Sequence, residues 1–121
     1  MASRKRVLIV DDDPTDGELA QRRLGALDID VDFHDGPEGA VDRIRDGGYA
    51  VVLLDLNMPG ISGLQILHAL RESHSDIRVL LYSAMEEPSL ADVAKTAGVD
   101  HLNKTASRTA LVDKVRSLLA G

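Results

Sequence analysis

Residues 50–60 read Ala-Val-Val-Leu-Leu-Asp-Leu-Asn-Met-Pro-Gly, an apolar run that ends at Asp55 and passes into turn residues. The run at 50–55 has the length of one strand, and its lack of polar residues before Asp55 is typical of a strand buried on both faces. Such strands occur in parallel sheets that helices cover on both sides. The stretch therefore predicts a central strand that carries Asp55 to its end, where the residue either caps the next segment or does chemistry.

Strand and helix patterns alternate along the rest of the chain. Two more wholly apolar strands are predicted at 7–10 and 79–83, whereas 29–34 and 99–103 mix apolar and polar residues, as edge strands do. Strict alternation of strands and helices predicts a parallel sheet with right-handed crossovers. The expected fold is a doubly wound α/β, flavodoxin-like domain with strand order 2-1-3-4-5 and five helices on both faces.

Capping and turn residues indicate where the helices begin. The first is expected to start at Asp13-Pro14, the second at Gly36-Pro37 and the fourth at Pro88. Ser62 followed by Gln65 has the spacing of a capping box and starts the third. Apolar residues at helical spacing predict the buried faces of the first and third helices: Leu19, Ala20, Leu24 and Leu27 in the first, and Leu64, Leu67 and Leu70 in the third.

Length, charge and cysteine content limit the classes of function. With 121 residues, 44% of them hydrophobic, the chain is expected to form a single domain over 1–121. The absence of cysteine excludes disulfides and thiolate chemistry and fits a cytoplasmic protein. A net charge of −6 argues against direct nucleic-acid binding. The apolar stretch near the N-terminus is too short for a membrane span, and the four histidines lack metal-ligand spacing.

Polar residues follow the predicted strands where those strands end. Asp11 and Asp12 follow the first strand, Asp55 ends the third, Ser83 ends the fourth and Lys104 follows the fifth. In an open parallel sheet, ligands bind beyond the carboxyl ends of the strands, at the point where the strand order reverses. Here that point lies between the first and third strands. We therefore expect these side chains to meet at one edge of the sheet.

The chemistry of this set points to phosphoryl transfer. Clustered carboxylates need a cation, and a hard divalent ion with oxygen ligands, Mg²⁺, fits them. Asp55 is the candidate nucleophile, while Lys104 would neutralise charge and Ser83 would donate a hydrogen bond. Each residue taken alone has a simpler interpretation. Asp13 reads as a helix cap, Asp11 or Asp12 as a loop acid, Ser83 as a strand-end hydroxyl and Lys104 as a solvated charge.

The order and spacing of these motifs resemble the receiver domain of two-component response regulators over the whole chain. The matching motifs are Val10-Asp11-Asp12, Asp-Leu-Asn-Met-Pro-Gly at 55–60, Ser83-Ala84 and Lys104. The resemblance implies that Asp55 is phosphorylated by the phosphohistidine of a sensor histidine kinase or a histidine phosphotransfer protein.

The resemblance also implies roles for the neighbouring residues. It places Asp12, Asp55 and the main-chain carbonyl of Asn57 around Mg²⁺, with Asp11 acting largely through water. Ser83 would move towards the phosphoryl group, and Lys104 would pair with its oxygens. The movement would switch the face formed by the fourth helix, fifth strand and fifth helix, which would then bind partners or form a phosphorylation-dependent homodimer. The expected members of this face are Ala91, Val93, Ala94, Val112 and His101.

Two residues depart from the family pattern. His101 stands where the family has an aromatic switch residue, and Thr105 follows Lys104 where a proline is frequent. The second variant is similar to receivers attached to helix-turn-helix output domains, and the 121 residues up to Gly121 contain no such domain. Asn57 and Met85 would set the lifetime of the aspartyl-phosphate by the same resemblance, or else serve only to pack their loops. Met85 has no charge to orient water, which favours slow self-hydrolysis.

Two other classes of function compete with a phosphorylated receiver. One is a phosphohydrolase that works through an aspartyl-phosphate. Such enzymes need a second acid two residues beyond the nucleophile, where this chain has Asn57, and a cap over the substrate. The other is a degenerate receiver that serves as a phosphate-independent docking module. His101 is its only support.

Overall fold

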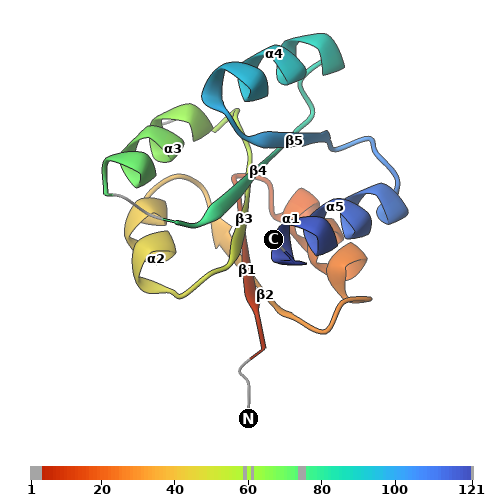
Figure 1. The fold of residues 1–121 in the computed structure, drawn as a ribbon. Helices are drawn as coiled ribbons and strands as arrows, with labels where there is room; N and C mark the ends of the chain where they lie inside the picture. The colour runs from red at the N-terminus through yellow and green to blue at the C-terminus, as the bar shows by residue number, and fades with distance from the viewer. Residues whose placement is uncertain (1–3, 59, 61, 74–75, 121) are drawn as a thin grey trace.

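The computed structural model describes residues 4–58, 60, 62–73 and 76–120, and within them five strands alternate with five helices (Figure 1). The strands are β1 (Arg6–Asp11), β2 (Asp30–Asp35), β3 (Val51–Leu54), β4 (Arg78–Ser83) and β5 (Asp100–Asn103). The helices are α1 (Pro14–Leu24), α2 (Ala40–Asp46), α3 (Gly63–Glu72), α4 (Glu87–Ala97) and α5 (Arg108–Ala120). The predicted strands all form, with ends that differ by one residue.

The strands make one parallel sheet in the order β2-β1-β3-β4-β5, as predicted. The central strand β3 is buried along its whole length, whereas no residue of β2 or β5 is fully buried. Val7 pairs with Val51, and Val10 pairs with Leu54, so β1 and β3 end side by side. The strand order therefore reverses where Asp11 and Asp55 lie.

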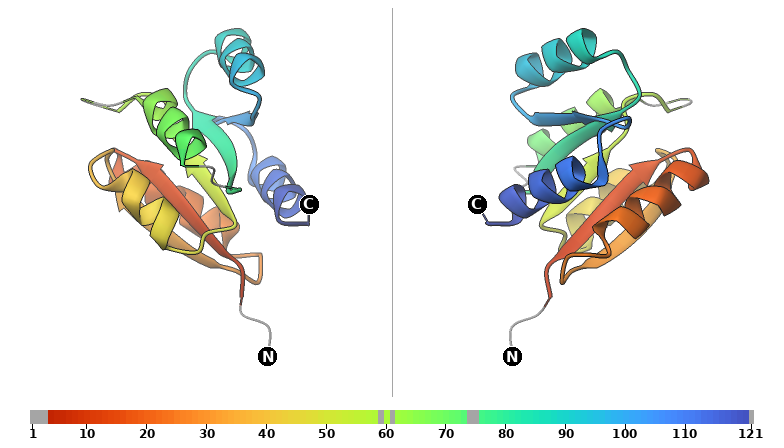
Figure 2. Two further views of the ribbon diagram at one scale, coloured as in Figure 1. Left: turned by 60° about the vertical axis from the view of Figure 1, so that its left-hand side comes forward. Right: turned by 90° about the vertical axis from the view of Figure 1, so that its right-hand side faces the viewer.

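Two apolar layers hold the helices against the sheet, because alternate residues of each strand point to opposite faces. On one face, Leu8, Val52 and Leu81 pack with the buried residues of α2, α3 and α4. On the other, Ile9 and Leu53 pack with those of α1 and α5. Figures 1 and 2 show α2 and α3 on one side of the sheet and α1 and α5 on the other. None of the helices in the described part of the chain is long and apolar enough to cross a membrane.

Three local predictions were wrong. Helix α2 begins at Ala40 rather than at Gly36-Pro37, because the left-handed φ angles of Gly36 (80°) and Gly39 (75°) form a turn there. Helix α1 ends at Leu24, so Leu27 packs against the core from the following loop. Leu19 and Leu64 lie on the predicted buried stripes but are 43% and 40% exposed.

The predicted helix caps at Asp13, Ser62 and Gly98 are confirmed. Asp13 caps α1 and accepts a hydrogen bond from the Thr15 N–H. Ser62 and Gln65 form the capping box of α3, and Gly98 ends α4 in a left-handed conformation. These caps fix where each helix starts or stops relative to its strand, and so position the loops at the carboxyl edge of the sheet.

Candidate functional site

Three carboxylates lie together where β1 and β3 end. Asp11 is the last residue of β1, Asp12 follows it, and Asp55 comes directly after β3. One oxygen from each lies within 4.8 Å of the others. Asp11 and Asp55 are buried, at 2% and 5% exposed, whereas Asp12 is exposed. Buried like charges this close repel one another, and a set made only of carboxylate oxygens fits a hard divalent cation such as Mg²⁺.

The backbone fixes the position of Asp55. Its N–H donates to the Val10 carbonyl at 3.0 Å, which extends the β1–β3 pairing by one residue. Helix α3 begins against its carbonyl, where a Cβ on Gly63 would lie 2.3 Å from the Asp55 oxygen. The Asn57 N–H points to Asp55 Oδ1 at 3.4 Å, and the Asn57 side chain is exposed. Asp55 is thus held between a strand and a helix start, with its carboxylate at the edge of the sheet.

The pKa of Asp55 is raised to about 6, chiefly because the carboxylate is buried. The positive charge of Lys104 acts to lower this pKa, and the negative charges of Asp11 and Asp12 act to raise it. The N–H of Asn57 lowers it by hydrogen bonding to the carboxylate. The charged form of Asp55 is therefore under-compensated by the protein's own groups, and a nearby cation would stabilise it.

Lys104 reaches the acidic group, but its ammonium lies closer to Asp11 and Asp16 than to Asp55. Its Nζ lies 2.7 Å from Asp11 Oδ2, 2.8 Å from Asp16 Oδ2 and 3.6 Å from Asp55 Oδ2. The backbone N–H of Lys104 donates a hydrogen bond to the Ser83 carbonyl at 2.9 Å, which fixes the position of the lysine. Burial lowers the pKa of Lys104, but hydrogen bonds to Asp11 and Asp16 and the charge of Asp55 raise it more, so the pKa ends above its ordinary value.

Asp16 was missed by the sequence reasoning. It is the third residue of α1, where an acid is favourable for the helix dipole. The signal that was available is the chain path: α1 starts two residues beyond Asp12, so its first turn stays close to the carboxyl edge of the sheet. An acid in that turn is therefore within reach of the lysine that follows β5.

Ser83 and Asn103 end neighbouring strands and hold the loop that follows β4. Ser83 is fully buried, and its Oγ accepts a hydrogen bond from the Met85 N–H at 3.2 Å. Asn103, the partner of Ser83 in the β4–β5 register, donates from Nδ2 to the Met85 carbonyl at 2.7 Å. The Met85 side chain packs against the core on the α3 and α4 side. The Ser83 oxygen thus accepts a hydrogen bond from the loop that follows its own strand.

His101 links β5 to α4. Its Nε2 lies 2.9 Å from Glu87 Oε1 in the first turn of α4, and the imidazole is 29% exposed. Two other residues predicted for the switching face were assigned wrongly. Ala94 and Val112 are 1% and 8% exposed, so they belong to the core rather than to a binding surface.

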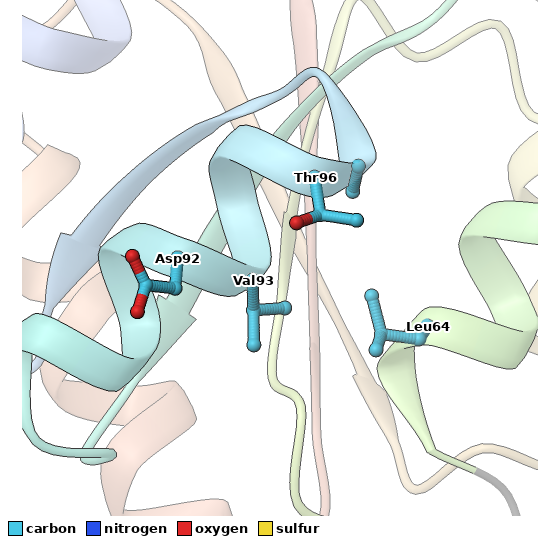
Figure 3. Close-up of a pocket in the computed structure, with 5 residues that line it drawn as sticks. Leu64, Asp92, Val93 and Thr96 are labelled. Carbon is cyan, nitrogen blue, oxygen red and sulfur yellow. The ribbon is translucent and has the colours of Figure 1, made fainter.

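A hollow of about 290 Å³ lies between α3 and α4, away from the acidic group (Figure 3). Its lining comes from Leu64 of α3 and from residues of α4, namely Asp92, Val93, Thr96 and Ala97. The sticks in Figure 3 show Val93 and Leu64 directed into the space between the two helices. The hollow is almost wholly apolar and contains none of the residues around Asp55, so it offers no phosphoryl chemistry.

Known proteins match both the sequence and the fold of the chain. The profile of the response regulator receiver domain matches residues 7–116. An uncharacterized transcriptional regulatory protein of Bacillus subtilis, YkoG, is 32% identical over 115 residues, which is 93% of this chain and 50% of that protein. Response regulator MprA of Mycobacterium tuberculosis is 33% identical over 116 residues, 94% of this chain and 50% of that protein. The chain thus spans about half the length of these relatives.

Solved structures of response regulators have the same fold as this chain. The signal receiver domain of a response regulator NarL from Mycobacterium tuberculosis is 31% identical, with a TM-score of 0.86 over 99% of each chain. Response regulator TrrA from Thermotoga maritima, solved in complex with Mg²⁺ and beryllium fluoride, is 32% identical, with a TM-score of 0.84 over 95% of this chain and 99% of that one. Receiver domains of this kind are signalling domains rather than enzymes. On the family match, the fold and the position of its acidic group, this chain belongs to the receiver domain family of two-component response regulators.

Proposed function

We propose that Asp55 accepts a phosphoryl group from the phosphohistidine of a sensor histidine kinase or a histidine phosphotransfer protein. The observation that carries the proposal is the position of Asp55. It is a buried carboxylate at the end of the central strand, with Asp11 and Asp12 within 4.8 Å and Lys104 at 3.6 Å. A nucleophile between a cation site and an ammonium is what phosphoryl transfer requires, because the protein mainly positions the groups and neutralises charge.

Asp11, Asp12, Asp55 and the main-chain carbonyl of Asn57 would hold Mg²⁺, with Asp11 in part through water. When bound, the ion neutralises the carboxylates and the oxygens of the phosphoryl group. An oxygen of Asp55 forms the new bond to phosphorus while the bond from phosphorus to the histidine nitrogen breaks. The electron pair of that bond stays on the imidazole. Lys104 pairs with the phosphoryl oxygens and lowers the cost of bringing two anions together.

Ser83 is the proposed link between the phosphoryl group and the rest of the domain. If the Ser83 side chain moves towards a phosphoryl oxygen to donate its hydroxyl hydrogen, its oxygen leaves the Met85 N–H from which it now accepts a hydrogen bond. This releases the loop that Asn103 also holds, and so connects the edge of the sheet to β5 and to the His101–Glu87 pair on α4. The face of α4, β5 and α5 would then change its affinity for a partner or for a second copy of the chain.

The 121 residues would act as one receiver unit in the cytoplasm, where the kinase domain supplies the phosphoryl group. The curated relatives are about twice as long and include named transcriptional regulators, so we propose that output lies outside this domain. With a net charge of −6, the domain itself is not expected to bind nucleic acid. No observation favours a phosphohydrolase or a phosphate-independent docking module.

The test is to incubate the protein with Mg²⁺ and acetyl phosphate and to measure its intact mass. Wild type should gain one phosphoryl group, and Asp55→Asn should gain none. Asp12→Asn and removal of Mg²⁺ with a chelator should each reduce the gain strongly. Asp35→Asn is the matched control, because Asp35 is an exposed acid that ends the neighbouring strand β2. A gain that persists in Asp55→Asn would overturn the proposal.

A further inference from the structure

The ammonium of Lys104 is shared between two carboxylates, neither of which is the proposed phosphoryl acceptor. The contacts to Asp11 (2.7 Å) and Asp16 (2.8 Å) are within hydrogen-bond range, whereas the 3.6 Å to Asp55 is beyond it. An ammonium has three N–H donors, and two of them are occupied by these partners. The Lys104 ammonium, which a phosphoryl group on Asp55 would need, is therefore already paired with Asp11 and Asp16 in the unphosphorylated protein.

Asp16 differs from Asp11 in what else it can do. Asp11 belongs to the group of three carboxylates that fits a cation, and its Oδ1 also accepts from the Asp13 N–H at 3.0 Å. Asp16 is outside that group, and the hydrogen bond from Lys104 is its contact across the fold. If Asp11 bound a cation, Asp16 would remain the carboxylate within hydrogen-bond distance of the Lys104 ammonium.

The exposure of the Asp16 side chain lowers the cost of breaking its contact with Lys104. The Asp16 side chain is 40% exposed, whereas that of Asp11 is 3% exposed. Water can therefore solvate the Asp16 carboxylate when the lysine leaves it, at a far smaller cost than for Asp11. A helix-dipole role explains why an acid is favourable in the first turn of α1, but it does not require the contact with Lys104.

We propose that Asp16 is a positioning residue that holds Lys104 on the α1 side of the site and competes with the phosphoryl group for its ammonium. The inference rests on the proposed function of Asp55. Phosphorylation adds about −1.5 to −2 charges at pH 7, enough to draw the ammonium from a half-exposed carboxylate. Asp16 thus sets how strongly the unphosphorylated state is favoured.

The experiment measures the affinity of the protein for beryllofluoride, an anionic mimic of the phosphoryl group, by ¹⁹F NMR at saturating Mg²⁺. Asp16→Asn frees the ammonium and should tighten binding by about two- to fivefold, the range expected for a partly exposed ion pair. Asp16→Glu restores a carboxylate and should bring the affinity back towards wild type. Asp35→Asn removes an acid from the same edge of the sheet and should change the affinity less than Asp16→Asn.

A double-mutant cycle separates positioning from a general effect of charge. If Asp16 acts through Lys104, Asp16→Asn should not tighten binding in a Lys104→Met background. The ¹⁵N signal of the Lys104 ammonium gives a second readout: Asp16→Asn should shift it without ligand, towards its position in the beryllofluoride complex.

Two outcomes overturn the inference while leaving the proposed function in place. In one, wild type binds beryllofluoride and Asp16→Asn binds it no more tightly. In the other, the gain from Asp16→Asn is the same with and without Lys104, which would make it an effect of net charge. Failure of wild type to bind beryllofluoride at all would overturn the proposed function and this inference together.

Discussion

Lys104 Nζ stands 3.6 Å from Asp55 Oδ2, close enough for a charge interaction but longer than a hydrogen bond. The lysine therefore offsets only part of what it costs to bury the Asp55 charge, and the pKa of Asp55 is raised to about 6. An acid whose pKa is higher in the folded state than in the unfolded state lowers the stability of the fold when it ionises. The same residue that is suited to accept a phosphoryl group is thus a source of instability.

Replacing Asp55 should stabilise the domain, with a defined pH dependence. Because the pKa of Asp55 is raised, its ionisation costs folded-state stability, and the cost grows as the pH rises from about 4 to about 6. Asp55→Asn should raise the free energy of unfolding by about 1–3 kcal/mol at pH 7, and little at pH 4. Chemical denaturation of both proteins without Mg²⁺ from pH 4 to pH 7 measures the difference. A wild type as stable as the variant at pH 7 would contradict the expectation.

The network of Arg6, Asp32 and Tyr49 should show the opposite pH dependence. Both Tyr49 Oη and Arg6 Nη2 donate to Asp32 Oδ2 at 2.8 Å, and the Tyr49 bond, followed by that of Arg6, lowers the pKa of Asp32. Tyr49→Phe should cost about 0.5–1.5 kcal/mol at neutral pH. A lowered acid pKa contributes stability above its usual value, so the cost should shrink as the pH falls below about 4.

Tyr82→Phe is the matched control for that prediction. The Tyr82 hydroxyl lies 3.4 Å from Arg23 Nη1 and has no carboxylate partner among the described contacts. Its removal should cost less than the removal of the Tyr49 hydroxyl, with no change across the acid range. Equal losses with equal pH dependence in the two variants would refute the assignment of the effect to Asp32.

A side chain at position 63 should disturb the site through the backbone. A Cβ there would lie 2.3 Å from the Asp55 carbonyl oxygen, which cannot rotate away as a side chain would. Gly63→Ala should destabilise the domain by about 1–3 kcal/mol and slow the reaction of Asp55 with acetyl phosphate. Ser62→Ala serves as the comparison: loss of the cap should cost about 1 kcal/mol and leave the reaction rate unchanged. An unchanged rate in Gly63→Ala would mean that α3 does not position Asp55.

Ser83→Ala should separate phosphorylation from the response to it. The variant loses the acceptor for the Met85 N–H, a bond worth about 1 kcal/mol, but it keeps Asp55 and the acidic group. The variant should therefore still bind beryllofluoride. The NMR signal of the Asn103 side-chain amide, which donates to the Met85 carbonyl, should no longer change position when beryllofluoride binds. Ser83→Thr retains the hydroxyl and should preserve the shift. A full Asn103 response in Ser83→Ala would remove Ser83 from the proposed link.

The sheet was predictable from sequence because its signals are local and repeated. The apolar runs at 7–10, 50–55 and 79–83 lie in the three central strands, and the mixed run at 29–34 lies in an edge strand. The meeting of Asp11 and Asp55 followed from this strand order, since β1 and β3 had to be neighbours. Helix ends were predictable where a side chain caps the backbone, as at Asp13 and Ser62.

Other features depend on packing that a pattern does not show. Leu64 has the spacing of a buried residue, but in the structure it borders the hollow between α3 and α4. Ala94 and Val112 were assigned to a surface and lie in the core. The contact of Lys104 with Asp16 joins residues 88 positions apart, and it can be anticipated only from the strand order and the start of α1, not from the residues next to either partner.

The most direct test of the central claim is to identify the phosphorylated residue itself. Borohydride reduces an aspartyl-phosphate to homoserine, so treatment of the protein with acetyl phosphate, Mg²⁺ and then borohydride leaves a permanent mark at the acceptor. Peptide sequencing by mass spectrometry should find homoserine at position 55, and none when Mg²⁺ or acetyl phosphate is left out. Homoserine at Asp11 or Asp12 instead, or none anywhere in a protein that has gained a phosphoryl group, would contradict the account.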